Sequence, residues 1–444
     1  MPNQQRPALE ITRALSDHAK AAQFEFGEDT ALVTVQHMLL QTVDLFQAVC
    51  DLGLPPENIF AAGKVYSDSP PVIRALRDMG VTVVDSTMPE PGEFNCYFQR
   101  DLDRLWRIAV QKLAQRRIKR VLVLDDGGMC ITSVPQDVLR RYAACGVEQT
   151  SQGIFLFEEK PPPFVVISWA RTAVKLELGG AIFSRCFIDK LNAEFLHGQC
   201  LQGALVGVIG LGSIGKGVAN LARRQNAQVL FYDPDPNLHL PGQLHHGITR
   251  VRSLEELMVR CDYVVGCSGR NPFNKLWPLN YRPRLKLFSC SGGDQEFGPI
   301  INDLKARAGF KVDPHSWDIN SEYGPSGPIH IAYRGFPYSF VSRGTEAVET
   351  RVVQLETGGL LAGLIQARLY LKLSEMGFRH TGKIQRLSIE AQRFVYNRWC
   401  AVMNRYGINV CEVYGYDPEV LRAAQCKSWY SQKSEPSPMT GLRQ

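Results

Sequence analysis

The sequence of 444 residues lacks the features that mark several special classes of protein. No apolar run approaches the ~18 residues of a membrane-spanning helix, and the polar segment 1–20 has no apolar core of a secretion signal. The 12 cysteines form no CxxC pair and no Cys/His cluster with zinc-ligand spacing. The net charge is only +6, without the concentrated basic face of a nucleic-acid binder. We therefore expect a cytoplasmic protein with reduced thiols, no metal site, and neither membranes nor nucleic acids as partners.

The chain instead has the composition of an ordinary globular enzyme, with 45% hydrophobic and 21% charged residues. Strand and helix patterns alternate in residues 58–128 and again in 204–236, which predicts parallel sheets covered by helices. Further helical patterns occupy 172–200, 345–375 and 388–405. These patterns predict an α/β fold with two Rossmann-like parallel-sheet domains, the second inserted into the first, and a helical C-terminal region.

The segment VGVIGLGSIGKG (206–217) carries the pattern GxGxxG between a predicted strand and a predicted helix. In this context Gly210 permits a tight turn, Gly212 lets a pyrophosphate approach the backbone, and Gly215 lets helix and strand pack closely. The next strand ends at Asp233, whose carboxylate can bind the adenosine ribose and would repel a 2′-phosphate. The pattern predicts NAD rather than NADP as the cofactor, with these binding residues: Gly210, Gly212, Ser213, Ile214, Gly215 and Asp233.

Polar residues stand where predicted strands of the first sheet end, which is where parallel sheets bind ligands. Asp126 follows the strand in LDDGG (124–128), and Lys64 follows another strand and could bind a carboxylate or phosphate. His37 begins a helix that should pack on the same sheet. A histidine can move a proton while NAD takes a hydride. We therefore predict that His37 and Asp126 face one cleft between the two domains, near the nicotinamide.

Five segments, in order, resemble segments of S-adenosylhomocysteine hydrolases. They are HMLLQT (37–42), LDDGG (124–128), GVEQTSQG (146–153), PFVVISWARTAVKLE (163–177) and GLGSIGKG (210–217). The resemblance implies a substrate domain and an NAD domain, and oxidation of a ribose hydroxyl by tightly held NAD. It also implies residue roles: His37, Asp126 and Glu177 as catalytic residues, Gln41, Lys64 and Glu148 at the substrate, and Thr150 and Ser151 at NAD.

The resemblance is incomplete where the family's reaction needs ionisable groups. Gln149, Ala173 and Gly293 stand at positions of a glutamate, a lysine and a histidine of that family. Loss of a positioned general base costs about 10²–10⁴ in rate. The resemblance therefore implies redox chemistry on a nucleoside-like or other small polar substrate rather than ordinary hydrolysis of S-adenosylhomocysteine. We also expect the protein to form a homo-oligomer.

Two alternatives stay open from the residues alone. A catalytically retired, NAD-dependent regulatory or scaffold protein would also keep the cofactor loop and lose catalytic groups. GLGSIGKG is similar, in addition, to the loop of D-2-hydroxyacid dehydrogenases, which need an arginine for the substrate carboxylate and a late histidine; the candidates are Arg270, His315 and His330. The predicted domain ranges are 1–182 and 345–410 for a substrate domain, 183–344 for the NAD domain, and 411–444 for a C-terminal tail.

Overall fold

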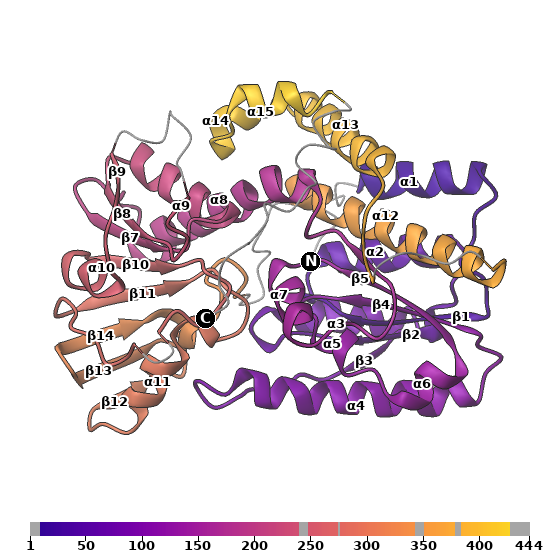
Figure 1. Cartoon of the computed structure of the whole chain (residues 1–444), viewed down its shortest axis with the longest axis horizontal. Helices are drawn as coiled ribbons and strands as arrows, with labels where there is room; N and C mark the ends of the chain where they lie inside the picture. Colours follow the sequence, from indigo (N-terminus) through magenta and orange to yellow (C-terminus); the bar gives the residue numbers. More distant parts are fainter. Residues whose placement is uncertain (1–8, 239–246, 274–275, 342–349, 378–382, 427–444) are drawn as a thin grey trace.

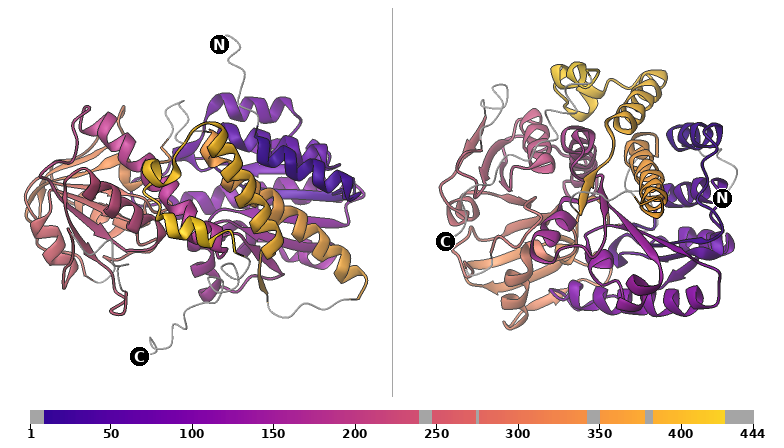
Figure 2. Two further views of the ribbon diagram at one scale, coloured as in Figure 1. Left: turned by 90° about the horizontal axis from the view of Figure 1, so that it is seen from above. Right: turned by 45° about the vertical axis from the view of Figure 1, so that its right-hand side comes forward.

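The chain forms two α/β lobes, which lie side by side in all three ribbon views (Figures 1 and 2). The predicted fold class is confirmed, because each lobe is built on a sheet of mainly parallel strands flanked by helices, and the end of the chain is helical. This computed structural model describes residues 9–238, 247–273, 276–341, 350–377 and 383–426.

The first lobe contains a seven-stranded sheet in which every paired strand is parallel to its neighbour. Its order is β15 (Ile384–Arg386), β6 (Val166–Ser168), β5 (Ala143–Glu148), β4 (Arg120–Asp125), β1 (Thr30–Val35), β2 (Ile59–Ala62) and β3 (Thr82–Val84). β1 is buried along its whole length, as expected for a parallel strand covered on both faces. Its successive residues alternate between the faces, so that Leu32 enters one hydrophobic core and Val33 the other.

Helices cover both faces of this first sheet. The core that contains Leu32 includes residues of α1 (Glu10–Ala21), α2 (Leu40–Asp51), α3 (Pro70–Asp78), α12 (Thr350–Glu375) and α13 (Ile389–Arg405). The core that contains Val33 includes residues of α4 (Phe94–Ala114), α5 (Met129–Thr132), α6 (Gln136–Arg141) and α7 (Ser151–Glu159). Since α12, α13 and β15 follow the second lobe in sequence, the chain returns to complete the first lobe.

The second lobe contains an eight-stranded sheet that is parallel except at one edge. Its order is β12 (Phe310–Val312), β13 (Ile319–Gly324), β14 (Gly327–Ile331), β11 (Leu285–Ser289), β10 (Tyr263–Gly266), β7 (Leu205–Ile209), β8 (Gln228–Tyr232) and β9 (Ile248–Arg250). Its helices are α9 (Ser213–Arg224), α10 (Leu254–Arg260) and α11 (Gly298–Lys305). The antiparallel edge has no clear sequence signal, because β13 is buried on only one side and carries mostly polar residues.

A continuous helical segment joins the lobes. It consists of α8 (Gly180–Lys190) between two π-helical turns, η3 (Lys175–Gly179) and η4 (Leu191–Phe195). It lies against the start of α9, where the Ser184 hydroxyl donates to the Ile214 carbonyl at 2.8 Å. π-Turns are rare and often occur at functional sites. This helical segment therefore leads from the first lobe and contacts the predicted cofactor loop.

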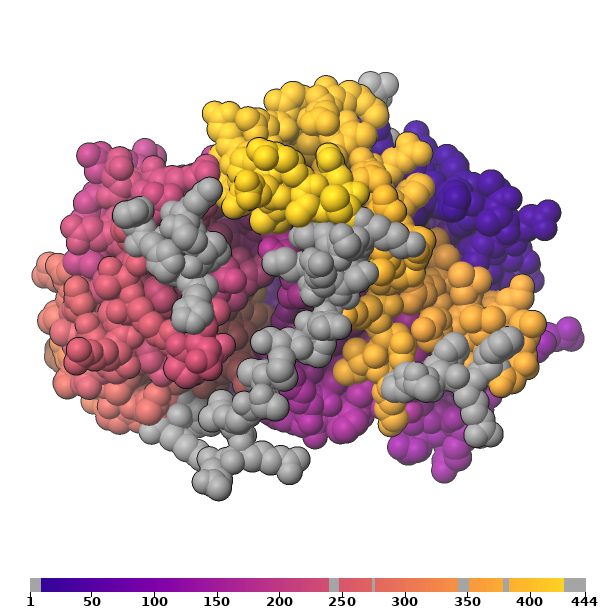
Figure 3. Space-filling view, turned by 45° about the horizontal axis from the view of Figure 1, so that its top comes forward, coloured from indigo at the N-terminus to yellow at the C-terminus, as the bar shows by residue number. Residues whose placement is uncertain are grey.

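The predicted domain ranges remain predictions. The limit at 182/183 falls inside α8, and the limit at 344/345 lies outside the described residues. The segment 411–444 is helical where it is described, in α14 (Val410–Tyr414) and α15 (Pro418–Ala423). These helices lie over the junction of the lobes (Figure 3), and the buried Tyr416 donates its hydroxyl to the Leu178 carbonyl. Residues 427–444 lie outside the described part.

Candidate active site

The predicted cofactor loop follows β7 and leads into α9. Gly210 has a φ of +84°, and a Cβ there would lie 2.7 Å from Ser268 Cα. At Gly215 a Cβ would lie 2.0 Å from the Gly210 carbonyl oxygen, so both positions exclude side chains. At Gly212, in contrast, no atom lies within 4 Å of the Cβ position. The backbone before the N-terminus of α9 is therefore open to a ligand such as a pyrophosphate.

Asp233 follows β8 beside this loop. Its Oδ2 accepts a hydrogen bond from the Leu211 amide at 2.7 Å, and its Oδ1 accepts one from the Asp235 amide at 3.0 Å. Each carboxylate oxygen has a second lone pair that a ribose hydroxyl could use. A hollow of about 300 Å³ adjoins the carboxylate; its lining residues are Tyr232, Asp233, Pro234, Arg250, Val251 and Arg252. This donor and acceptor set fits the adenosine end of NAD.

Ser213 and Ile214 make their described contacts away from the open side of the loop. The Ser213 hydroxyl donates to the Leu176 carbonyl in η3 at 2.7 Å, and the Ile214 carbonyl accepts from Ser184. These two predicted cofactor residues therefore tie the loop to the helical connection between the lobes.

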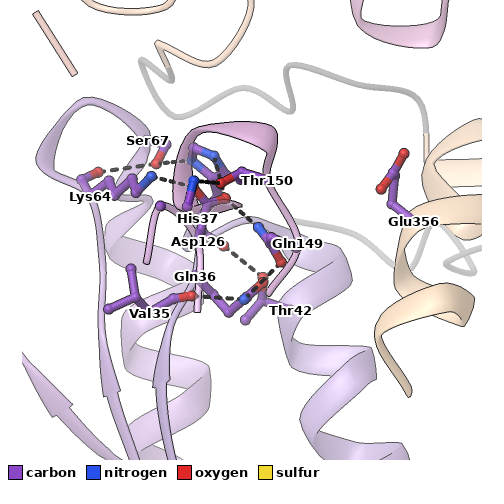
Figure 4. Close-up of polar contacts among 12 residues, drawn as sticks. Val35, Gln36, His37, Thr42, Lys64, Ser67, Asp126, Gln149, Thr150 and Glu356 are labelled. Carbon is purple, nitrogen blue, oxygen red and sulfur yellow. Dashed lines mark hydrogen bonds and ion pairs between the residues drawn. The ribbon is translucent and has the colours of Figure 1, made fainter. Parts of the chain in front are cut away.

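Three predicted site residues meet at the carboxyl end of the first sheet (Figure 4). His37 follows β1, Lys64 follows β2 and Asp126 follows β4, and these three strands are neighbours. Lys64 donates to Asp126 Oδ1, and His37 Nε2 lies 3.4 Å from Asp126 Oδ2. The carboxyl ends of parallel strands share one edge, which explains why distant residues meet here. We call His37, Lys64 and Asp126 the polar cluster.

Gln149 also contacts the polar cluster. The sequence drew attention to it only because it stands where the resembled family has an ionisable glutamate. Its Nε2 donates to Asp126 Oδ2, and its Oε1 accepts from Gln36 Nε2 at 3.0 Å. An amide can donate and accept at once, so Gln149 connects Asp126 to Gln36. A glutamate at position 149 would instead place a second carboxylate against Asp126.

The charges in the polar cluster fix its protonation states. Burial on its own would raise the pKa of Asp126, but Lys64 and His37 outweigh burial and hold the pKa well below its usual range. Burial lowers the pKa of His37 more than Asp126 raises it, so the net pKa lies below the ordinary value. The Asp126 carboxylate outweighs burial at Lys64 and raises the pKa of its ammonium. Asp126 is therefore ionised, Lys64 is charged, and His37 is the group that can change its charge.

The His37 ring is held on both its edge and its face. Its Nδ1 lies 2.7 Å from the Ser67 hydroxyl oxygen in η2 (Val65–Ser67). Phe340 stacks on the ring with 4.3 Å between the centroids and 5° between the planes. Phe340 lies roughly 300 residues further along the chain and also contacts Phe183 of α8, with 5.1 Å between the centroids. The position of Ser67 after a strand was a usable sequence signal, whereas Phe340 had none.

Glu148 and Thr150 hold local structure. Glu148 Oε1 accepts from the Thr150 amide and hydroxyl, both at 2.7 Å, and from the Gly127 amide at 3.2 Å. Thr150 caps α7 by accepting from the Gly153 amide at 3.0 Å. Burial and the neighbouring Asp125 raise the pKa of Glu148 well above its usual range. Glu148 thus joins the turn after β4 to the start of α7, where Ser151 is exposed.

The remaining predicted substrate and catalytic residues, Gln41 and Glu177, lie on helical segments. Gln41 is in α2, and within the described part of the chain its buried Oε1 has no hydrogen-bond partner. Glu177 is half-buried in η3. In the same turn Lys175 forms an ion pair of 2.6 Å with Glu356 of α12, which also accepts from Trp169 Nε1 at 2.7 Å. Figure 4 shows Glu356 apart from the polar cluster.

A narrow crevice separates the polar cluster from the second lobe. Its volume is about 10 Å³, close to the space of one water molecule. Its lining residues are Lys64, Phe94, Asn95, Phe98, Asp126, Gly127, Met129, Gln152, Gly292, Gly293 and Gln295. Gln295 Nε2 donates across it to Asn95 Oδ1 at 2.8 Å. Lys64 and Asp126 therefore face the loop that follows β11 of the second lobe, whereas His37 is not among the residues that line the crevice.

The three candidate residues of the alternative D-2-hydroxyacid dehydrogenase reading, Arg270, His315 and His330, make their described contacts outside the polar cluster. Arg270 stacks over the Phe155 ring at 4.3 Å and lies 3.8 Å from Glu158. His330 is on β14 with its Nδ1 3.0 Å from Asn320 Oδ1, and the His315 amide belongs to an exposed turn. In the contacts described for these histidines, neither meets the polar cluster. Among these three histidines, His37 is the one that lies beside Asp126.

One comparison with known proteins assigns a class to part of the second lobe, which we call the cofactor lobe. The sequence model of the family "D-isomer specific 2-hydroxyacid dehydrogenase, NAD binding domain" matches residues 187–275. Two proteins of Mycobacterium tuberculosis described as uncharacterized, from strains CDC 1551 and H37Rv, are 28% identical over 311 residues. The alignment covers 70% of this chain and 58% of theirs, so this chain spans little more than half the length of these relatives.

Two solved structures are similar to parts of this chain. A D-isomer specific 2-hydroxyacid dehydrogenase family protein from Aeromonas salmonicida subsp. salmonicida is 11% identical, with 81% of this chain and 99% of that chain covered and a TM-score of 0.40. A glyoxylate reductase from Paecilomyes thermophila is 13% identical, with 63% and 78% covered and a TM-score of 0.29. We draw no conclusion from likenesses at these scores.

The family match defines the class of the cofactor lobe as an NAD-binding domain. The predicted cofactor, NAD, is confirmed, and the broader prediction of an NAD-dependent oxidoreductase agrees with the match. More particularly, the matched segment is similar to the NAD-binding domain of D-isomer specific 2-hydroxyacid dehydrogenases. Among the described helices, none combines the length and apolar character needed to cross a bilayer.

The resemblance to S-adenosylhomocysteine hydrolase is wrong, and so is the main function inferred from it, because the matched family is a different one. The motifs on which the resemblance was based form local turns, helix caps and loops that occur in many α/β proteins. LDDGG ends a strand in two glycines with φ of +109° and +78°, and Thr150 is an N-cap. The GxGxxG loop serves any dinucleotide. Short motifs of this kind identify turns and caps more reliably than they identify a family.

Proposed function

We propose that the protein is an NAD-dependent oxidoreductase that interconverts a hydroxyl and a keto group on a small organic acid, as a 2-hydroxyacid dehydrogenase does. The observation that supports this proposal best is the polar cluster. Its lysine and its ionised carboxylate face the cofactor lobe across the crevice, and its histidine lies 3.4 Å from that carboxylate. NAD, when bound, would accept or return the hydride. The protein's own residues must then move one proton and bind the acid group.

His37 moves the proton in this proposal. Its lowered pKa leaves the ring neutral at neutral pH. A substrate hydroxyl that donates to Nε2 would place the proton of the neutral ring on Nδ1, where the Ser67 oxygen can accept it, so the ring can take the substrate proton at Nε2. The imidazolium that results lies 3.4 Å from the ionised Asp126, which stabilises the new charge. In the reverse direction the imidazolium returns the proton to the reduced oxygen. Asp126 orients the ring and stays ionised throughout, because its pKa is far too low for proton exchange.

Lys64 binds the acid group of the substrate in this proposal. Its ammonium lines the crevice and has three donors, of which Asp126 takes one. The side chain is only 3% exposed, and a charge-assisted hydrogen bond is strong in such a site. A substrate with a carboxylate next to its reacting carbon would place that carboxylate near Lys64 and its oxygen near His37.

The test is the consumption of NADH with a series of small 2-oxo acids, followed by the absorbance of the reduced nicotinamide. His37→Ala should lower kcat by about 10²-fold or more. His315→Ala and His330→Ala are matched controls, since they remove the other two candidate histidines and should leave the rate unchanged. If either control removes the activity while His37→Ala keeps it, the assignment of His37 fails.

Measurements of NAD binding and of turnover together distinguish this proposal from the alternative of a catalytically retired regulatory or scaffold protein. Calorimetric titration with NAD measures binding without any substrate. If NAD binds and no 2-oxo acid is reduced, the catalytic proposal is rejected, and a cofactor-binding regulatory protein becomes the better description.

A further inference from the structure

The hydroxyl of Ser67 has two partners and only one proton. Its oxygen lies 2.7 Å from His37 Nδ1 and 3.0 Å from the carbonyl oxygen of Lys64. The side chain is completely buried, so water does not compete for either contact. A hydroxyl donates one hydrogen bond and accepts up to two, and its proton rotates to suit its neighbours. Ser67 can therefore donate to the ring or to the carbonyl at any one time.

In the protein without substrate, the neutral form of His37 determines one orientation of the Ser67 hydroxyl. Nε2 faces the ionised Asp126 and carries the ring proton, because two acceptors would repel each other across 3.4 Å. Nδ1 then has a lone pair and needs a donor. Ser67 is the donor at hydrogen-bond distance, so its proton points to the ring.

The protonated form of His37 determines the opposite orientation of the Ser67 hydroxyl. Nδ1 now carries a proton and needs an acceptor, which the Ser67 oxygen provides. The Ser67 proton then turns to the Lys64 carbonyl, which already accepts from the Ser67 amide at 2.7 Å and has a second lone pair. Both orientations use the heavy-atom positions that are already present.

We propose that Ser67 is a positioning residue for His37 that reverses its hydrogen bond when the ring gains or loses a proton. The inference rests on the proposed function for the role of His37 and deepens it, because it explains how a largely enclosed ring changes its charge, or holds its proton on Nδ1 for a substrate at Nε2, without leaving Nδ1 unpaired. In this proposal Ser67 acts through His37 and does not contact the substrate. Ser67 thereby completes a chain that runs from the Lys64 carbonyl through Ser67 and His37 to Asp126.

The charged and titratable groups around His37 are Asp126, Lys64, Lys175 and the Tyr66 phenol, whose ring centroid lies 5.8 Å from that of His37. Asp126 from the loop after β4 favours the protonated ring, while Lys64 before η2 and Lys175 of η3 disfavour it. None of these side chains touches Nδ1 in the contacts described. Removing the Ser67 hydroxyl therefore changes the environment of Nδ1 and leaves the surrounding charges in place.

The test is nitrogen NMR of the full-length protein with labelled histidine, with the His37 signals assigned from their loss in His37→Ala. In the unsubstituted protein, Nδ1 should lack a proton above the His37 pKa and carry one below it. Ser67→Ala should lower the pKa of His37 by about one unit, because the protonated ring loses a charge-assisted bond and the neutral ring loses a weaker one. Ser67→Thr keeps a hydroxyl and should restore the original value.

Ser69→Ala is the matched control, since Ser69 is also buried and lies two residues away without capping α3 by its side chain. An equal shift in Ser69→Ala, an unchanged pKa in Ser67→Ala, or a proton on Nδ1 above the pKa would each overturn the inference. The last measurement uses the unsubstituted protein, so it applies even if Ser67→Ala fails to fold. The NMR test needs no substrate; a shift without any reduction of 2-oxo acids would reject the proposed function and keep the role of Ser67.

Discussion

Phe340 and His37 lie face to face, although one comes from the segment that returns from the cofactor lobe and the other from the turn after β1. The rings are parallel to within 5°, so Phe340 shields one face of the imidazole from water. Burial is the largest influence on the pKa of His37 and lowers it. The return of the chain to the first lobe therefore helps to set the state of the proposed proton-transfer group.

The first prediction concerns this stack. Phe340→Ala should expose the His37 ring and raise its pKa toward the ordinary value of a histidine, by about half a unit to one unit. Phe340→Leu is the matched variant, because it keeps an apolar cover and should shift the pKa less. NMR titration of His37 measures both. A pKa that stays the same or falls in Phe340→Ala would show that the ring does not control the solvation of His37.

The second prediction concerns the buried ion pair between Lys64 and Asp126. Asp126→Asn should lower the free energy of unfolding by about 3–5 kcal/mol, because it leaves the ammonium buried without its partner. The double variant Lys64→Met with Asp126→Asn should recover part of this loss, since it removes both charges. Urea unfolding measures all three proteins.

A matched control for that experiment is Asp137→Asn, which breaks an exposed ion pair with Arg140. Exposed pairs of this kind contribute little, so the control should unfold like the unsubstituted protein. If Asp126→Asn were as stable as the control, the polar cluster would not be desolvated in solution.

The third prediction concerns the cofactor loop. Gly212→Leu should fold, because the space at its Cβ position is open, and should lose NAD binding, because the side chain would occupy the place of the pyrophosphate. Gly203→Leu is the comparison variant, because Gly203 has equally open surroundings and lies outside the cofactor loop. Its positive φ adds some strain to this variant. Calorimetric titration with NAD and with NADP measures binding. The unsubstituted protein should prefer NAD, and equal affinity for NADP would contradict the role of Asp233.

Local patterns in the sequence predicted the parts of the fold that depend on neighbouring residues. The parallel sheets and the loop from Gly210 to Gly215 follow from periodicity and glycine spacing, and the family match to residues 187–275 agrees with the NAD assignment. The meeting of His37 and Asp126 was also predictable, because the ends of parallel strands share one edge.

Other features depend on contacts that no short segment contains. Phe340 reaches His37 only because the chain crosses to the second lobe and returns, and the pairing of Lys175 with Glu356 joins the connecting helix to α12. The family resemblance failed for a related reason, since its motifs describe turns and caps that unrelated sheets share. The role of Gln149 was hidden because it is visible only beside Gln36 and Asp126.

The last prediction concerns Glu296, a fully buried carboxyl between the ends of β10 and β11. It contacts the Ser291 hydroxyl and accepts from the Ser268 amide at 3.3 Å, so it joins the loop after β10 to the loop after β11, which borders the crevice. Burial raises the pKa of Glu296 to about 7. The folded protein therefore holds a proton that the unfolded chain releases from about pH 4.5 upward.

The sign of the effect on stability follows from this difference. The contribution of Glu296 is fully present below the unfolded pKa and is lost as the pH rises through about 7, by up to roughly 3 kcal/mol. Glu296→Gln keeps the shape of the side chain without its charge, so its stability should fall less between pH 5 and pH 8.5 than that of the unsubstituted protein. Glu256→Gln, at an exposed helix, should leave the pH dependence unchanged. Urea unfolding across this pH range measures the three curves, and parallel curves for Glu296→Gln and the unsubstituted protein would mean that Glu296 is ionised in the folded state at every pH tested.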